Sequence, residues 1–288
     1  MTRQNEIGPE PEDAKTWLNG GIAKRDLGQH KEAIADFDEA IRLDPENTDA
    51  WLNRSISKRN LGQHEEAIAD CDEAIRLDPE NTDAWLNRSI VKRLVGQRKE
   101  AIADCDEAVR LDPESAGAWL NRGIARRGLG QHKEAIADCD EAIRLDPESA
   151  GAWLNRSIVK RLIGQRKEAI TDCDEAVRLD PGSAGAWLNR GIARRGLGQH
   201  KEAITDCDEA VRLDPESAGA WLNRGIAKGQ LGQHKGAVAD LDEAIRLDPE
   251  NASAWLRRSF SKGQLGQHKE AIADFDEAAR LDPENARA

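Results

Sequence analysis

The apolar positions of residues 48–81 recur at the spacing of an α-helix. One stripe in the second half of this segment follows the intervals i, i+1, i+4, i+7 and i+8: Ala67, Ile68, Cys71, Ala74 and Ile75. Such a stripe predicts an amphipathic helix from Glu65 to Leu77. The stretch from Asp49 to Leu61 contains neither proline nor glycine and fits another helix of about three turns. Gly62 ends the first helix and Pro79 cannot continue the second, so the segment predicts a helix–turn–helix hairpin.

The same pattern recurs along the chain at a fixed interval of 34 residues. Tryptophan follows this interval eight times: Trp17, Trp51, Trp85, Trp119, Trp153, Trp187, Trp221 and Trp255. Proline follows it in Asp-Pro pairs: Pro45, Pro79, Pro113, Pro147, Pro181, Pro215, Pro249 and Pro283. With Trp at position 4, the repeats are 14–47, 48–81, 82–115, 116–149, 150–183, 184–217, 218–251 and 252–285. The sequence therefore predicts an all-α chain of eight hairpins, with a flexible N-terminal segment at 1–13 and a tail at 286–288.

The period and its residues resemble the tetratricopeptide repeat. Trp at position 4, Gly at 15, Ala at 20 and 27 and Pro at 32 carry the resemblance over residues 14–285. It implies a right-handed superhelical solenoid whose first helices line a concave groove, and the near-identical units predict a regular superhelix. Positions 7 and 11, usually Leu and Tyr in the family, are here Arg54 and Lys58 and their equivalents. Contacts between helices are therefore expected to be thinner than usual.

Charge and hydropathy restrict the classes of partner. The formal net charge of -12 argues against nucleic acid and against an anionic membrane surface, since both require a basic footprint. No apolar run approaches the ~18 residues that a membrane span needs. The N-terminus also lacks the apolar stretch of a secretory signal. We therefore expect a cytoplasmic protein that binds neither nucleic acid nor membrane.

Residues with catalytic or metal-binding chemistry occur only in periodic columns. The cysteines recur at position 24 of the inner units, where a small buried residue is expected: Cys71, Cys105, Cys139, Cys173 and Cys207. The histidines share position 17, where packing is expected: His30, His64, His132, His200, His234 and His268. The acidic motif around Asp70 and Asp72 repeats in every unit and is expected on a solvated helix face. No nucleophile has a partnered base. The prediction is a protein that is not an enzyme and has no cofactor.

An asparagine column at position 6 gives the strongest indication of a binding surface. Asn is a poor residue for the middle of a helix, and its amide can hydrogen-bond a peptide backbone. The resemblance places positions 2, 5, 6, 9, 12 and 13 of the first helix in the concave groove. The candidate peptide-binding residues are Asn53, Asn87, Asn121, Asn155, Asn189, Asn223, Arg59, Arg93, Arg127, Arg161, Arg195, Leu86 and Ile90.

Alternatives to a peptide groove remain open. The asparagines can be neutral residues copied by duplication, or can bond only to their neighbours, and the arginines can merely neutralise the acidic second helices. Basic first helices on an acidic protein instead favour an acidic or phosphorylated extended ligand. The family's carboxylate clamp is not expected, because its sites read Leu18, Ile22, Asp83 and Asn87.

The sequence therefore predicts a protein–protein interaction scaffold for an extended protein or peptide ligand. One alternative is a self-assembling solenoid whose uncapped terminal repeats stack. The chain is accordingly expected to be a monomer or a weak end-to-end oligomer. The other is a regulatory arm of a larger protein.

Overall fold

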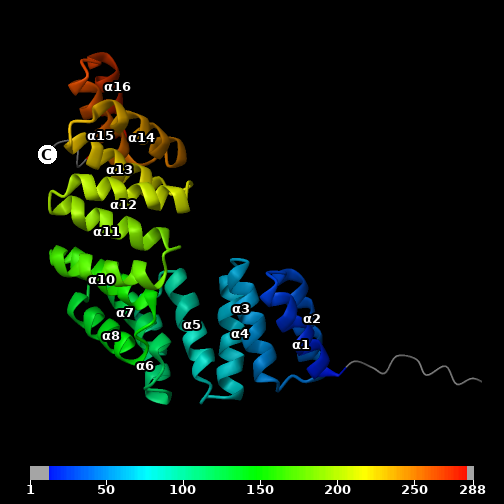
Figure 1. The fold of residues 1–288 in the computed structure, drawn as a ribbon. Helices are drawn as coiled ribbons and strands as arrows, with labels where there is room; N and C mark the ends of the chain where they lie inside the picture. The colour runs from blue at the N-terminus through cyan, green and yellow to red at the C-terminus, as the bar shows by residue number, and fades with distance from the viewer. Residues whose placement is uncertain (1–12, 284–288) are drawn as a thin grey trace, which may run out of the picture. The chain divides into compact units, whose positions relative to one another are not determined.

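The computed structural model describes residues 13–283. Residues 1–12 of the expected N-terminal segment and the expected tail at 286–288 lie outside the described residues. Within them the chain forms sixteen α-helices and no strand, which confirms the predicted all-α array of eight hairpins (Figure 1). The helices are α1 Ala14–Asp26, α2 His30–Leu43, α3 Thr48–Asn60, α4 His64–Leu77, α5 Thr82–Leu94, α6 Arg98–Leu111, α7 Ala116–Gly128, α8 His132–Leu145, α9 Ala150–Leu162, α10 Arg166–Leu179, α11 Ala184–Gly196, α12 His200–Leu213, α13 Ala218–Gln230, α14 His234–Leu247, α15 Ala252–Gln264 and α16 His268–Leu281.

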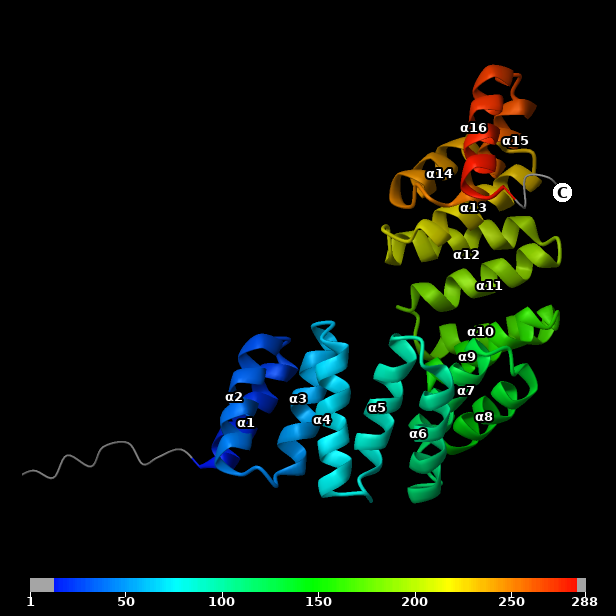
Figure 2. The same ribbon diagram turned by 180° about the vertical axis from the view of Figure 1, so that it is seen from behind.

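The chain divides into two compact units, Met1–Asp146 and Pro147–Ala288. The first contains α1 to α8 and the second α9 to α16, and Figure 2 shows the paired helices of each from behind. Within a unit, the two helices of a hairpin pack together and each even-numbered helix packs on the next odd-numbered one. Odd-numbered helices also contact the next odd-numbered helix, whereas the described even-numbered helices contact only odd-numbered ones. The odd-numbered helices therefore form a continuous layer within each unit.

The turn inside each hairpin depends on one glycine. Gly62 has φ = 77°, in the left-handed region that favours glycine. Its N–H donates to the carbonyl of Arg59 at 3.0 Å, and the N–H of Gln63 donates to that of Lys58 at 2.9 Å. These two bonds satisfy carbonyls at the end of α3 that would otherwise lack a partner. The helix α4 can then begin directly at His64.

The loop between hairpins explains why Trp and Pro define the period. The indole N–H of Trp51 donates to the carbonyl of Pro45 at 2.9 Å, while the side chain of Asn47 accepts from the N–H of Ala50 and caps α3. The Trp-to-Pro bond recurs, with nearly the same length, in the later repeats: Trp85–Pro79, Trp119–Pro113, Trp153–Pro147, Trp187–Pro181, Trp221–Pro215 and Trp255–Pro249. Each Trp thus ties the start of a helix to the loop before it.

The structure corrects the expectation that the acidic motif lies wholly in solvent. Asp70 is buried, with a side chain only 4% exposed, and it accepts from Arg54 at 2.7 Å and pairs with Lys58 at 2.8 Å. The reason is that the cations at positions 7 and 11 stand where the family has apolar residues, and their charge offsets the desolvation of the carboxylate. Only the second Asp of the motif is exposed, as Asp72 is.

Arg54 also joins consecutive repeats. Its guanidinium donates to Asp38 of the preceding repeat at 2.5 Å and stacks 4.6 Å from the ring centroid of Trp51. Burial opposes the charge on Arg54, but hydrogen bonds and attraction from Asp70 and Asp38 outweigh it and raise the pKa of this guanidinium. The arrangement recurs with Arg88 between Asp104 and Asp72, Arg122 between Asp138 and Asp106, Arg190 between Asp206 and Asp174, Arg224 between Asp240 and Asp208, and Arg258 between Asp274 and Asp242. Ion pairs thus supply contacts between helices that the sequence alone suggested were thin.

The cysteines are buried free thiols in the core of the repeats, as expected from their column. Burial raises the pKa of Cys71, Cys105 and Cys173 to about 11 and that of Cys207 to about 12, from an ordinary value of 9.0. At position 8 these cysteines face Ser or Gly. In the first repeat, a Cβ on Gly21 would overlap the ring of Phe37, which replaces cysteine there. Glycine at position 8 of the first repeat therefore makes room for the ring at position 24.

We expect these thiols to be inert in the native protein. A thiol reacts as its thiolate, so near pH 8 a disulfide reagent should label the folded chain very slowly and all five cysteines of the urea-unfolded chain quickly. Because the folded pKa is raised, the stabilisation by the buried thiols is complete below pH 9 and is lost as pH rises toward about 11. Fast labelling of the native protein near pH 8 would contradict the buried placement.

Candidate functional site: the groove on the odd-numbered helices

The predicted binding columns meet in one hollow of the first unit. It has a volume of about 370 Å³ and lies on α1, α3 and α5. Its lining is Arg25, Asp49, Leu52, Asn53, Ile56, Arg59, Asp83, Leu86, Asn87 and Ile90. We call this surface, formed in each unit by positions 2, 5, 6, 9 and 12 of the odd-numbered helices, the odd-helix groove. Five candidate residues thus come together: Asn53, Asn87, Arg59, Leu86 and Ile90.

The other candidates occupy equivalent positions on neighbouring odd-numbered helices. Asn121, Asn155, Asn189 and Asn223 lie on α7, α9, α11 and α13. Arg93, Arg127, Arg161 and Arg195 lie on α5, α7, α9 and α11. Contact of these residues with a ligand stays a prediction. The lining also contains Leu52 and Ile56, the equivalents of Leu86 and Ile90 in the preceding repeat, together with Asp49 and Asp83 at position 2.

The asparagines already have partners within the chain. The amide nitrogen donates to the backbone carbonyl four residues earlier, as in Asn53 to Asp49 at 2.7 Å and Asn189 to Gly185 at 2.8 Å. In four of the asparagines the amide oxygen accepts from the position-12 arginine of the preceding repeat. Such pairs are Arg25–Asn53, Arg59–Asn87, Arg161–Asn189 and Arg195–Asn223. The neighbour bonding considered as an alternative is therefore present in the unliganded chain, where it orients the arginines.

Asn87 differs from the rest of its column. Its residue is only 4% exposed, and its amide donates to the hydroxyl of Ser55 and to the sulfur of Cys71 at 3.3 Å. A buried amide with these partners is committed to the core. We therefore expect Asn87 to contribute less to ligand contact than Asn189 or Asn223.

Four of the position-12 arginines have no carboxylate partner among the described residues. Arg59, Arg93, Arg161 and Arg195 are partly buried and form no ion pair with any described residue. Burial lowers the pKa of all four. The Nε–H groups of Arg93, Arg161 and Arg195 are buried without a hydrogen-bond acceptor.

Neighbouring arginines of the odd-helix groove also repel one another. After burial, the charges of Arg257 and Arg161 lower the pKa of Arg195, and the charge of Arg93 lowers that of Arg59. A stripe of partly desolvated, mutually repelling guanidiniums attracts anions.

The basic residues can either neutralise the acidic second helices or face the groove, and the answer differs between positions 7 and 11 and position 12. Arg190 and Arg194, at positions 7 and 11 of α11, are neutralised by Asp206 on α12. Arg195, at position 12 of the same helix, is not. Position 12 of this helix therefore contributes a positive charge that the neighbouring helix does not neutralise.

The second unit has the more positive groove. Its odd-numbered helices α9, α11, α13 and α15 contain no Asp or Glu. In the first unit, by contrast, Asp49 and Asp83 lie in the hollow beside Arg25 and Arg59. The position-12 arginines of the second unit therefore have no acidic residue on their own layer of helices.

The histidine column fits a packing role. His234 lies edge-on to Phe260, with ring centroids 6.2 Å apart, and His30 lies 3.4 Å from the amide of Asn60. Among residues 13–283, no cluster of His, Cys, Asp and Glu has the arrangement needed to hold a metal ion.

Comparison with known families agrees with this geometry. Models described as tetratricopeptide repeat match residues 18–89 and 222–286, and also 116–149 and 184–217. The chain belongs to the tetratricopeptide-repeat family. A model of anaphase-promoting complex subunit 5 matches 83–117 and 146–180, about one repeat each time. No curated protein matches the sequence.

Solved structures of tetratricopeptide-repeat proteins are similar in fold. A chain of the anaphase-promoting complex Cut9–Hcn1 hetero-tetramer has 19% identity and a TM-score of 0.74, and the match covers 88% of this chain and 50% of that one. A tetratricopeptide repeat protein from Parabacteroides merdae has 18% identity and a TM-score of 0.67, over 86% and 98% of the two chains. YrrB, a repeat protein with an unusual peptide-binding site, has 24% identity and a TM-score of 0.50, over 64% and 95%. This chain thus spans half the length of the Cut9–Hcn1 chain that it matches.

Tetratricopeptide-repeat proteins generally serve as protein-interaction scaffolds. In the described part of this chain, none of the helices has the length and apolar character that crossing a bilayer requires.

Proposed function

We propose that this protein is a non-catalytic scaffold that binds an extended acidic segment of a protein partner in the odd-helix groove. One observation carries the proposal: Arg161 and Arg195 lie partly buried on helices that have no acidic residue, and no described carboxylate pairs with them. A peptide carboxylate would satisfy these charges with charge-assisted hydrogen bonds.

The asparagines support this role by holding the arginines in place. Arg161 reaches Asn189, and Arg195 reaches Asn223, through bonds of 3.3 Å to a neutral amide oxygen. A carboxylate is a stronger acceptor than an amide, so a ligand can replace this bond at little cost. The aliphatic residues at positions 5 and 9 then provide an apolar floor for the ligand side chains.

A titration series tests the proposal. Acidic, neutral and basic peptides of the same length would be added to the protein and their binding followed by calorimetry. We expect the acidic peptide to bind most tightly and to weaken when salt rises from about 50 to about 200 mM, because salt screens the groove charges. Equal affinity for the acidic and basic peptides would refute the proposal.

The buried free thiols support a reducing, cytoplasmic location, which we propose for the protein.

Self-assembly through the terminal repeats is the second candidate. Leu27, directly after α1, is 74% exposed, whereas Leu61 at the same position of the next repeat is 37% exposed. Ile272 and Phe275 on α16 are also exposed. Gly20 weakens this candidate, because it replaces the arginine that elsewhere ties a repeat to the preceding one. Light scattering over a range of protein concentrations distinguishes stacking from a monomeric scaffold.

A further inference from the structure

Three departures from the repeat meet at one hollow of the second unit. Gly229 replaces the usual Arg at position 12, Arg257 replaces the usual Asn at position 6, and Phe260 replaces the usual Ile at position 9. All three line a hollow of about 460 Å³ between α13 and α15, with Gln230 and His234. Elsewhere in the groove, successive repeats present nearly identical residues.

The apolar wall of this hollow is an exposed aromatic ring. Phe260 is 59% exposed, which is unusual for so large an apolar side chain on a helix that packs on its neighbours. His234 contacts it edge-on and leaves other parts of the ring open, at an interplanar angle of 68°. The hollow is comparable in size to small ligand pockets and has room for a large apolar side chain.

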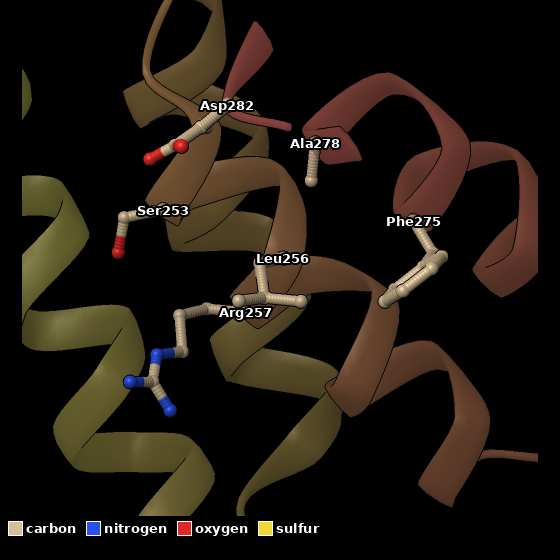
Figure 3. A pocket seen from close by; sticks show the side chains of 7 residues that line it. Ser253, Leu256, Arg257, Phe275, Ala278 and Asp282 are labelled. Atoms are coloured by element: carbon tan, nitrogen blue, oxygen red, sulfur yellow. The ribbon is translucent and has the colours of Figure 1, made fainter. Parts of the chain in front are cut away.

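The same hollow carries an uncompensated positive charge. Arg257 is exposed and forms no ion pair with any described residue, yet it lies close enough to Arg195 for its charge to lower the pKa of that guanidinium. Arg257 also lines a second hollow with Phe275 and Ala278 of α16, and Figure 3 shows its side chain extending away from both. Gly229 leaves open space where a third guanidinium would otherwise stand. An anionic group next to an apolar one therefore complements this hollow.

We propose that the hollow of Gly229, Arg257 and Phe260 is an anchor pocket, which takes a large apolar side chain flanked by carboxylates and so fixes the register of the bound segment. This inference rests on the proposed function, because it concerns the same acidic ligand. The physical need for an anchor follows from the repeat. A charged peptide bound to near-identical repeats can shift by one repeat with little change in binding free energy. One unique pocket makes a single register the most stable.

Filling the pocket tests the inference with a matched control. Gly229→Leu places a side chain in the hollow, and its Cβ meets Ser261 Oγ at 3.5 Å and Ala237 Cβ at 3.8 Å, which are ordinary contacts. Gly263→Leu is the control: Gly263 is the equivalent residue on α15, has nothing within 4 Å of its Cβ and does not line the hollow. Both changes replace a helical glycine with a better helix former, so both variants should fold.

The probes are two acidic peptides that differ only in one central residue, Phe or Ala. We expect the wild-type protein and Gly263→Leu to bind the Phe peptide about tenfold more tightly than the Ala peptide, because the pocket buries the aromatic ring. In Gly229→Leu the two affinities should become equal, at the wild-type value for the Ala peptide.

The outcomes separate the two proposals. If the wild-type protein binds both peptides equally, the anchor pocket is wrong and the acidic groove is still supported. A preference for the Phe peptide that persists in Gly229→Leu has the same consequence. Failure of the wild-type protein to bind either peptide overturns the proposed function and the anchor with it.

Discussion

Replacing Arg88 with alanine is expected to lower the free energy of unfolding by about 3 kcal/mol, the lower end of the range for breaking a buried ion pair. The change leaves Asp104, whose side chain is 4% exposed, with Lys92 as its remaining ion-pair partner. It also removes the bridge to Asp72 on the preceding repeat and the contact with the Trp85 ring at 4.7 Å. Lys92 still pairs with Asp104 at 2.8 Å, which is why the loss should not reach the upper end of the range.

Urea denaturation followed by circular dichroism measures this loss. Arg110→Ala is the matched control, since Arg110 forms an exposed pair with Glu107 one turn away on the same helix. Exposed pairs of this kind contribute little, so the control should unfold at nearly the wild-type urea concentration. If Arg88→Ala and Arg110→Ala unfold alike, the buried network is not what joins the repeats.

The second large effect concerns binding. Replacing both Arg161 and Arg195 with glutamine should weaken an acidic peptide about 100-fold, or about tenfold for each charge-assisted hydrogen bond lost. Glutamine retains a side-chain donor for the amide oxygens of Asn189 and Asn223, so the local packing should persist. Burial already lowers the pKa of both arginines, which means that the fold gains little from their charge.

The control for this experiment removes the same charge from the even-numbered helices. Arg178→Gln with Arg212→Gln breaks exposed pairs with Glu175 and Glu209 on α10 and α12. Calorimetric titration of the acidic peptide should show nearly wild-type affinity for this variant. An equal loss in both variants would mean that net charge, rather than the groove, attracts the peptide.

The candidate site was largely predictable in position but not in bonding. The resemblance to the tetratricopeptide repeat implied that Asn53, Arg59, Leu86 and Ile90 share one face, and all four line one hollow. It could not show that Asn189 already bonds to Arg161, or that Asn87 serves the core, because those partners lie on other helices. Alignment of the repeats shows that Gly229, Arg257 and Phe260 depart from the usual residues at their positions. That all three line one hollow depends on the packing of α13 against α15.

The sequence by itself determined the period, the hairpins and their turns. Local interactions suffice for these, because Gly62 can adopt a left-handed turn and Trp51 bonds to a carbonyl only six residues earlier. Tertiary structure decided which charges are satisfied. Arg88 and Arg93 lie on the same helix, yet Arg88 reaches carboxylates on α4 and α6, while Arg93 reaches none. The difference is one of direction in space, since a step of five residues turns a helical side chain to another face.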